Sequence, residues 1–312
     1  MGSVFMLQTT SQVSSRPVSA VHSLGRIDRL PIGVDAQLLT HYPAMKLGME
    51  PAIAVYAKKL TPMARELILN STSTREWVVT APPFNVLPAA ANLLSWRVFE
   101  NLASDPELKQ RVFLLDLKIP RDRVAINSKQ DFKTYFEYSS HSIERRIQER
   151  QRMHGSAEYI TGQHKALRDR GVIVINDIKV TGTQQRFMQD AFNQVKPNCV
   201  HWLYILALEE QLGSDHPEIE HTINSSSINS LEDFYEVLDA EHVHYTARCV
   251  SRLFALDLTE FSDLVSKLCP DKRTKLIDLA RQEGRYDGAL FADKMRYLES
   301  LGAGIGDKFA AQ

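Results

Sequence analysis

Residues 171–185 combine residue types whose order could bind a phosphorylated ligand. Four consecutive β-branched apolar residues at 172–175 predict a strand buried on both faces, as in the middle of a parallel sheet. Asp177 follows at the carboxyl end of this strand, where ligands of open α/β sheets bind. A Thr-Gly-Thr turn at 181–183 then opens a predicted helix, whose free N–H groups suit an anion. The segment therefore predicts a phosphate site beside an acid, and the alternative is an ordinary buried strand with a glycine turn.

This segment resembles the signature of type I phosphoribosyltransferases, which bind phosphoribosyl pyrophosphate (PRPP). In that signature, four apolar residues precede two acids, two variable residues, a Thr-rich pair, Gly, a variable residue and Thr. The segment has neither the glycine pattern of a P-loop nor that of a dinucleotide fold. The resemblance implies that the loop at 178–184 holds the ribose 5-phosphate and that Asp177 binds the 2- and 3-hydroxyls of the ribose. The positions implied to bind PRPP are Asn176, Asp177, Lys179, Val180, Thr181, Gly182, Thr183 and Gln184.

Three positions depart from the signature. Asn176 stands where the first acid would be, which weakens any role of that position in ordering magnesium. The resemblance implies Mg²⁺ as a cofactor that bridges the ribose hydroxyls and pyrophosphate, and Asp177 is then the candidate metal ligand. Val180 replaces the Asp that acts as a base in the hypoxanthine-guanine enzymes, which argues against their proton-transfer step here. Gln184 stands in the place of the final Thr.

A second segment, at 77–94, is similar to the pyrophosphate loop of orotate phosphoribosyltransferases. There a strand runs into Gly-Pro, an aromatic residue, Lys-Gly, an aliphatic residue, Pro and an Ala-rich helix. The missing Lys removes a positive contact to pyrophosphate, and Val86 would strain an unusual backbone turn. A plain Pro-rich connection between a strand and a helix is the alternative. The predicted loop consists of Pro83, Phe84, Asn85 and Val86.

The long polar stretch at 121–165 separates the two segments and is rich in arginine. In enzymes of this family, a mobile loop here closes over PRPP and supplies cations, which stabilise the charge that develops on the leaving pyrophosphate. A solvated amphipathic helix is the alternative, because the charged residues at 144–150 can pair along one helical surface. The catalytic candidates are Arg121, Arg123, Arg145 and Arg146, with Lys118 beside them.

The order of elements predicts an α/β fold with a parallel sheet, of the type I phosphoribosyltransferase kind. The chain divides into an N-terminal arm and helix at 1–70 that could form a hood, an α/β core at 70–210 with a mobile insertion at 121–165, and a helical C-terminal part at 211–312. We expect an irregular arm over 1–30, and Pro62 is expected to break or kink the helix at 50–70. Predicted strands are 77–80, 112–117, 172–175 and 200–206, and predicted core helices are 89–102 and 183–195.

Composition places the chain among ordinary globular proteins. Of its 312 residues, 44% are hydrophobic and 24% charged, and the net charge of −1 gives no strong nucleic-acid signal. Three scattered cysteines indicate a reducing compartment, and neither a signal peptide nor an apolar run long enough to cross a membrane is found, so we expect a cytoplasmic protein.

The expected reaction displaces pyrophosphate from PRPP with an unidentified small-molecule acceptor, in a chain that could act as a homodimer. The large helical part favours a specialised member of the family, of the stress-response kind encoded in tellurite-resistance clusters. The rival hypothesis is a catalytically inactive regulatory protein that binds PRPP or a nucleotide, and a further one is an interaction protein whose helical part holds a partner.

Overall fold

The computed structural model describes residues 17–30, 36–119 and 158–303, which are built around a five-stranded sheet. All four neighbouring strand pairs are parallel, so the predicted α/β fold with a parallel sheet is confirmed. The order across the sheet is β1-β5-β4-β2-β3. The strands are β1 (Val18–Ile27), β2 (Trp77–Thr80), β3 (Val112–Leu115), β4 (Gly171–Lys179) and β5 (Cys199–Leu208).

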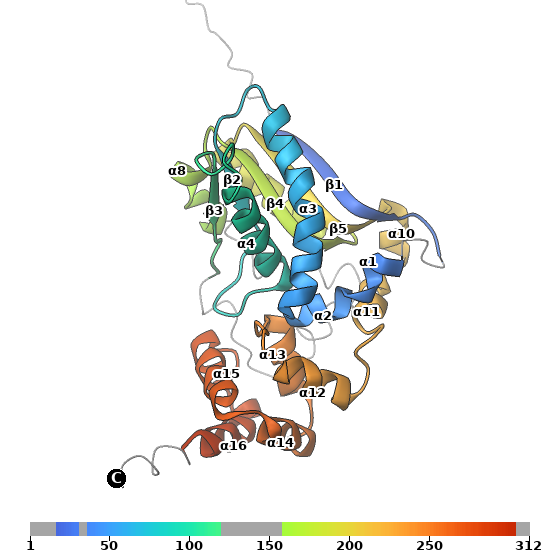
Figure 1. Ribbon diagram of the computed structural model, residues 1–312, viewed down its shortest axis with the longest axis vertical. Helices are drawn as coiled ribbons and strands as arrows, with labels where there is room; N and C mark the ends of the chain where they lie inside the picture. The colour runs from blue at the N-terminus through green and yellow to red at the C-terminus, as the bar shows by residue number, and fades with distance from the viewer. Residues whose placement is uncertain (1–16, 31–35, 120–157, 304–312) are drawn as a thin grey trace, which may run out of the picture.

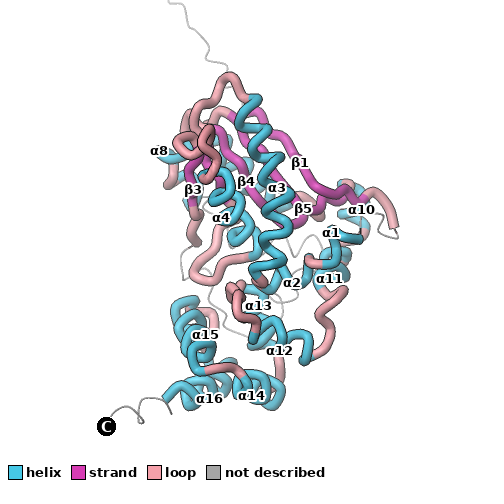
Figure 2. The backbone as a smooth tube through the Cα atoms, in the orientation of Figure 1, coloured by secondary structure: helices cyan, strands magenta, loops and turns pink. Residues whose placement is uncertain are grey.

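Helices cover both faces of this sheet and continue beyond it (Figures 1 and 2). None of the described helices is both long enough and apolar enough to span a membrane. The helices before β5 are α1 (Ala36–Thr40), α2 (Tyr42–Leu47), α3 (Glu50–Asn70), α4 (Ala90–Ala103), α7 (Glu158–Thr161), α8 (His164–Leu167) and α9 (Thr183–Val195). Those after it are α10 (Glu210–Asp215), α11 (Ile219–Asn224), α12 (Leu231–Asp239), α13 (Ala247–Ala255), α14 (Leu258–Lys267), α15 (Pro270–Glu283), the 3-10 turn Ala289–Phe291 and α16 (Ala292–Ala303).

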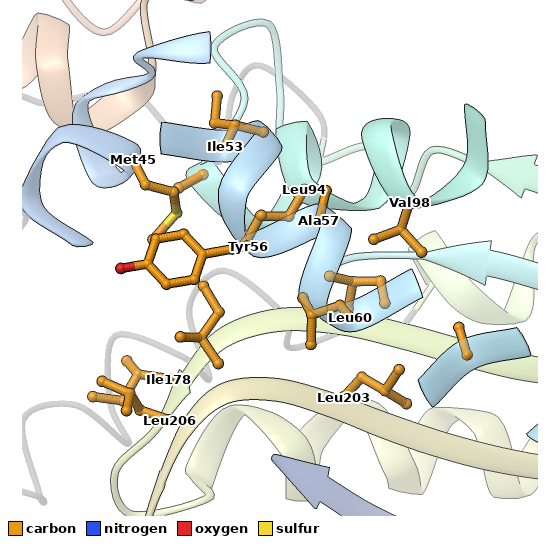
Figure 3. Packing of buried hydrophobic residues seen from close by; sticks show 14 of the residues in the cluster. Met45, Ile53, Tyr56, Ala57, Leu60, Leu94, Val98, Ile178, Leu203 and Leu206 are labelled. Carbon is orange, nitrogen blue, oxygen red and sulfur yellow. The ribbon is translucent and has the colours of Figure 1, made fainter. Parts of the chain in front are cut away.

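The alternating side chains of β4 are buried on both faces of the sheet. Ile173 and Ile175 pack in the cluster formed with α3 and α4, and Figure 3 shows α3 residues of this cluster above β4 and β5. Val172 and Val174 pack on the opposite face, in the cluster that contains α7 and α9. This burial on both sides is what the apolar run in the sequence predicts for a central parallel strand.

The helices α12 to α16 enclose a hydrophobic core of their own, centred on residues such as Phe254 and Phe261. This helical part lies on the side of the sheet where α2 and the start of α3 are found (Figure 1). Leu47 of α2 and Leu87 of the loop after β2 belong to the same core. The helical part is therefore packed directly against α2 and the loop after β2.

One local prediction from the sequence is wrong, and a second is wrong in part. Residues Val18–Ile27 do not form an irregular arm but the edge strand β1, which pairs in parallel with β5. Its Ser, His and Gly content gives a weak strand signal, and Val18 and Val21 stay exposed, so pairing with β5 stabilises it more than burial does. The helix α3 runs from Glu50 to Asn70 past Pro62, so Pro62 does not start a new helix, and a kink at Pro62 stays a prediction. Its continuous buried face, with Tyr56 and Leu60, outweighs the lost hydrogen bond.

The three cysteines differ in exposure, which predicts a difference in reactivity. Cys269 is exposed, whereas Cys249 is buried and its pKa is raised to about 12 by burial. Because the thiolate is the reactive form, a thiol reagent should label Cys269 quickly and Cys249 only after unfolding. Time-resolved labelling followed by peptide mass spectrometry checks this, with Cys269→Ser as the control that loses the fast phase. Fast labelling of Cys249 in the native protein would contradict the packing of α13.

Candidate functional site

The two segments singled out in the sequence meet at one place in the fold. Strands β2 and β4 are neighbours, so the loops that follow them leave the same carboxyl edge side by side. Helix α4 after β2 packs on one face of the sheet and helix α9 after β4 on the other. The chain thus departs in opposite directions from two adjacent strands, which is the arrangement at which open α/β sheets bind their ligands.

The loop after β4 has the geometry of an anion site. Gly182 is the N-cap residue of α9 and has φ 67°, a left-handed conformation that glycine adopts without strain. Thr181 Oγ1 lies 2.8 Å from Thr183 Oγ1, and both hydroxyls are buried at the start of the helix. Within the described part of the chain, the backbone N–H groups of Thr181 and Gly182 have no hydrogen-bond acceptor. Free amides, two hydroxyls and a helix start together suit a phosphate.

The positions that depart from the family signature stabilise this loop. The side chain of Asn176 donates to Gln184 Oε1 at 3.0 Å and accepts from the backbone N–H of Asp177 at 2.9 Å. Val180 is buried, and its carbonyl oxygen lies where a Cβ on Gly213 would clash at 2.1 Å. Asn176 and Gln184 thus tie the end of β4 to the first turn of α9.

Asp177 is held in a buried network of charges that the sequence did not predict. Lys46 of α2 forms an ion pair with its Oδ2, Tyr42 donates to the same oxygen at 3.5 Å, and the Ile178 amide donates to Oδ1 at 2.9 Å. Lys46 also lies 3.4 Å from Glu220 of α11. Burial raises the pKa of the Tyr42 hydroxyl, and the negative charges of Asp177 and Glu220 raise it further. Tyr42 therefore stays a neutral donor to the carboxylate.

Lys46 and Glu220 are site residues that sequence reasoning missed. Lys46 is separated from Asp177 by 131 positions, and no motif surrounds it in the sequence. The sequence carries no signal that distinguishes Lys46, because a lysine between two apolar residues is common in an amphipathic helix.

The loop after β2 runs parallel to the segment that follows β3. The Phe84 amide donates to the Leu117 carbonyl at 3.1 Å, and the Ile119 amide donates to the Phe84 carbonyl at 2.8 Å. Between them, Lys118 Nζ lies 3.4 Å above the Phe84 ring and 3.4 Å from the Asn85 carbonyl oxygen. Burial lowers the pKa of Lys118, while the charges of Asp116 and Glu283 act in the opposite direction. Lys118 thus places its ammonium group at this loop, in which Asn85 stands where the orotate phosphoribosyltransferases have a lysine.

The amides of this loop bind an internal carboxylate. Glu283 Oε2 accepts from the N–H groups of Val86 at 3.1 Å and Leu87 at 2.9 Å, and the Asn85 side chain donates to the Glu283 carbonyl at 3.0 Å. Glu283 is 1% exposed and forms an ion pair with Arg285, which is 3% exposed. The carboxylate of Glu283 therefore anchors the helical part on the predicted pyrophosphate loop.

The loop requires no left-handed backbone at Val86. In the described ranges, the non-glycine residues with positive φ are Asp169 and Lys196, so the strain expected at Val86 is not found. The role of residues 83–86 in binding pyrophosphate stays a prediction, and it would require Glu283 to share or release these amides. Four further predicted residues, Arg121, Arg123, Arg145 and Arg146, lie outside the described residues.

The described residues near the loop after β4 do not form a set of ligands for the implied Mg²⁺. Across the described ranges, no group of three or more His, Cys, Asp or Glu residues could hold a metal ion. The side-chain oxygen of Asn176 and both oxygens of Asp177 accept hydrogen bonds from the chain, and an ammonium group stands beside Asp177. As arranged, these residues do not fit a protein-bound Mg²⁺, and ligation by Asp177 would require Lys46 to move.

Comparison with known protein families assigns this chain to a family. A family model described as PRTase ComF-like, where PRTase denotes phosphoribosyltransferase, matches residues 121–298, which is more than half of the chain. No curated protein and no solved structure matches it significantly. The matched range contains the strand β4, the phosphate-type loop and Asp177. The chain therefore belongs to the ComF-like phosphoribosyltransferases, which confirms the type I phosphoribosyltransferase assignment predicted from residues 172–184.

Proposed function

We propose that the protein transfers the phosphoribosyl group of PRPP to a small nucleophilic acceptor. The observation that carries this proposal is the free-amide loop at Thr181 and Gly182 directly beside the buried carboxylate of Asp177, at the switch point of the sheet. The loop suits the 5-phosphate, and the carboxylate suits the neighbouring ribose hydroxyls, as in type I phosphoribosyltransferases. The family match supports phosphoribosyl transfer in general.

In the proposed reaction, the bond between C1 of the ribose and the pyrophosphate oxygen breaks, and its electron pair leaves with pyrophosphate. A lone pair of the acceptor forms the new bond at C1, and the acceptor then loses its proton to solvent. Cations lower the barrier by stabilising the charge on the leaving group. Lys118 is the described candidate, and Arg121, Arg123, Arg145 and Arg146 are further candidates in the basic stretch. Mg²⁺ carried by the ligand would add further positive charge to the leaving pyrophosphate.

A second candidate function is favoured by a specific observation. Glu283 occupies the amides of Val86 and Leu87, and Lys46 occupies Asp177, so both predicted loops are engaged by other parts of the chain. A protein that binds PRPP or a nucleotide as a signal, and exchanges these contacts for ligand contacts, would need no turnover. The three cysteines are free, which supports the proposed location of the protein, as an enzyme or as a regulator, in a reducing compartment such as the cytoplasm.

A calorimetric titration with PRPP, with and without Mg²⁺, followed by a pyrophosphate-release screen separates these functions. The screen covers purine and pyrimidine bases, amines and other nucleophiles. Pyrophosphate release that depends on one acceptor class supports transfer. Binding of PRPP with no release for any acceptor supports the regulatory function. Failure to bind PRPP rejects both phosphoribosyl transfer and regulation by PRPP.

Replacement of Thr181 by Val tests the phosphate loop. The change removes a buried hydroxyl beside the free amides while keeping the side-chain shape, so affinity for ribose 5-phosphate should fall by about 1–3 kcal/mol. Titration calorimetry with ribose 5-phosphate measures this. Thr222→Val, at an exposed position of α11, is the matched control and should bind like the unmodified protein. Equal affinities of the two variants would place the phosphate elsewhere.

A further inference from the structure

The buried lysine Lys46 lies beside Asp177, the carboxylate at the centre of the proposed ligand site. Lys46 is 9% exposed and Asp177 8%, so the two charges face each other away from bulk water. A lysine is rarely buried to this extent unless it is paired. The ammonium has three N–H donors, and the described contacts use two of them, on Asp177 and Glu220. No contact between described residues uses the third donor, which can meet a ligand that reaches Asp177.

Two contacts with the segment 244–246 fix the position of Lys46. Helix α2 ends at Gly48, which has φ 97° and whose Cβ would meet the His244 carbonyl oxygen at 1.8 Å. Thr246, the N-cap residue of α13, donates through its hydroxyl to the Lys46 carbonyl at 2.9 Å. The helical part therefore positions this lysine, as a rigid element should for a binding residue.

The charges around the site are balanced by the chain itself. Asp177 and Glu220 are the two acids, and Lys46 contacts both, while Arg248 Nη2 lies 4.0 Å from Glu220. Asn176 adds no charge where the family signature has an acid. The ammonium of Lys46 supplies positive charge beside these two carboxylates. A divalent cation between two carboxylates supplies positive charge to oxygen ligands in the same way.

We propose that Lys46 is a PRPP-binding residue that supplies, beside Asp177, the positive charge a protein-bound metal ion would otherwise supply. Its third N–H group donates to an oxygen of the ribose diol or of the pyrophosphate while Asp177 accepts from the ribose hydroxyls. This inference rests on the proposed function, because it assumes that PRPP occupies the loop after β4. Its consequence is that PRPP binding does not depend on a divalent cation.

The test is calorimetric titration with PRPP, once in excess EDTA and once in excess Mg²⁺. For the unmodified protein, the two affinities are expected to agree within ~10-fold. Lys46→Gln keeps a donor but removes the charge, and is expected to lower the affinity in EDTA by about 10- to 100-fold. Mg²⁺ should restore part of this loss, because it returns positive charge to the site. Lys46→Arg keeps the charge and should retain more affinity in EDTA than Lys46→Gln.

Lys267→Gln is the matched control, since Lys267 forms an exposed ion pair with Asp263 far along the chain on α14. Thermal unfolding of each variant establishes that it is folded at the titration temperature. The inference is overturned if the unmodified protein binds PRPP in Mg²⁺ and not in EDTA, a result that needs no variant to fold. It is also overturned if folded Lys46→Gln binds as tightly in EDTA as Lys267→Gln. If the unmodified protein binds PRPP under neither condition, the proposed function itself fails.

Discussion

Replacing Asp177 by Asn is expected to lower the affinity for PRPP by more than ~100-fold, the largest functional effect of any single substitution in this site. Two ribose hydroxyls are proposed to donate to the carboxylate, and a hydrogen bond to a charged group contributes about 1.5–3 kcal/mol. The amide of Asn presents one acceptor instead of two and carries no charge. The substitution also leaves Lys46 with Glu220 as its remaining described carboxylate partner, so an ammonium without its main counter-ion faces the ligand.

This change has a cost in stability that must be separated from binding. Removing one partner of a buried ion pair typically costs 3–5 kcal/mol, and the remaining contact of Lys46 with Glu220 should reduce that cost. The affinity is therefore measured by titration at a temperature where circular dichroism shows the variant to be folded. Asp190→Asn, at an exposed position on α9, is the control and should bind PRPP normally. A folded Asp177→Asn protein with unchanged affinity would place the sugar elsewhere.

Replacing Glu283 by Ala is expected to cause the largest loss of stability, about 3–5 kcal/mol. The substitution removes the acceptor of two backbone N–H groups, at Val86 and Leu87, and leaves the guanidinium of Arg285 buried without this carboxylate. It also weakens the packing between the helical part and the α/β core, because these contacts join α15 to the loop after β2. Urea unfolding should show a lower transition midpoint.

The matched control for Glu283 is Glu299→Ala on α16. Glu299 pairs with Arg281 at 2.7 Å, but Arg281 is 59% exposed and Glu299 36%, so the loss should stay below about 1 kcal/mol. Similar midpoints for the two variants would show that the Glu283 contacts do not anchor the helical part. Faster pyrophosphate release or tighter PRPP binding by a folded Glu283→Ala protein would show, in addition, that this carboxylate competes with the ligand.

The central strand and its phosphate-type loop could be predicted because their determinants are local. Four β-branched residues in a row specify a strand buried on both faces, and Gly182 supplies the left-handed residue at the start of α9. The sequence predicted the strands at 77–80 and 172–175 but not that they are neighbours. The structure shows that β2 and β4 pair in parallel, which places the loops that follow them on the same edge of the sheet.

The rest of the site depends on contacts between distant segments. Lys46 meets Asp177 and Glu283 meets Val86 across 131 and 197 positions, and neither pairing has a periodic signature in the sequence. The edge strand β1 was missed for a similar reason, because its polar composition is compensated by hydrogen bonds to β5. Pro62 does not break α3 because the packing of this helix on the sheet outweighs the low helix propensity of proline.

A crystal structure of the protein with PRPP bound would test the proposed ligand site. In this complex, the 5-phosphate is expected to accept hydrogen bonds from the amides of Thr181 and Gly182, and the ribose diol is expected to lie against Asp177, with Lys46 in contact with the ligand. PRPP bound away from the loop after β4, with those two amides unused and Asp177 contacting only Lys46, Tyr42 and the Ile178 amide, would contradict this expectation.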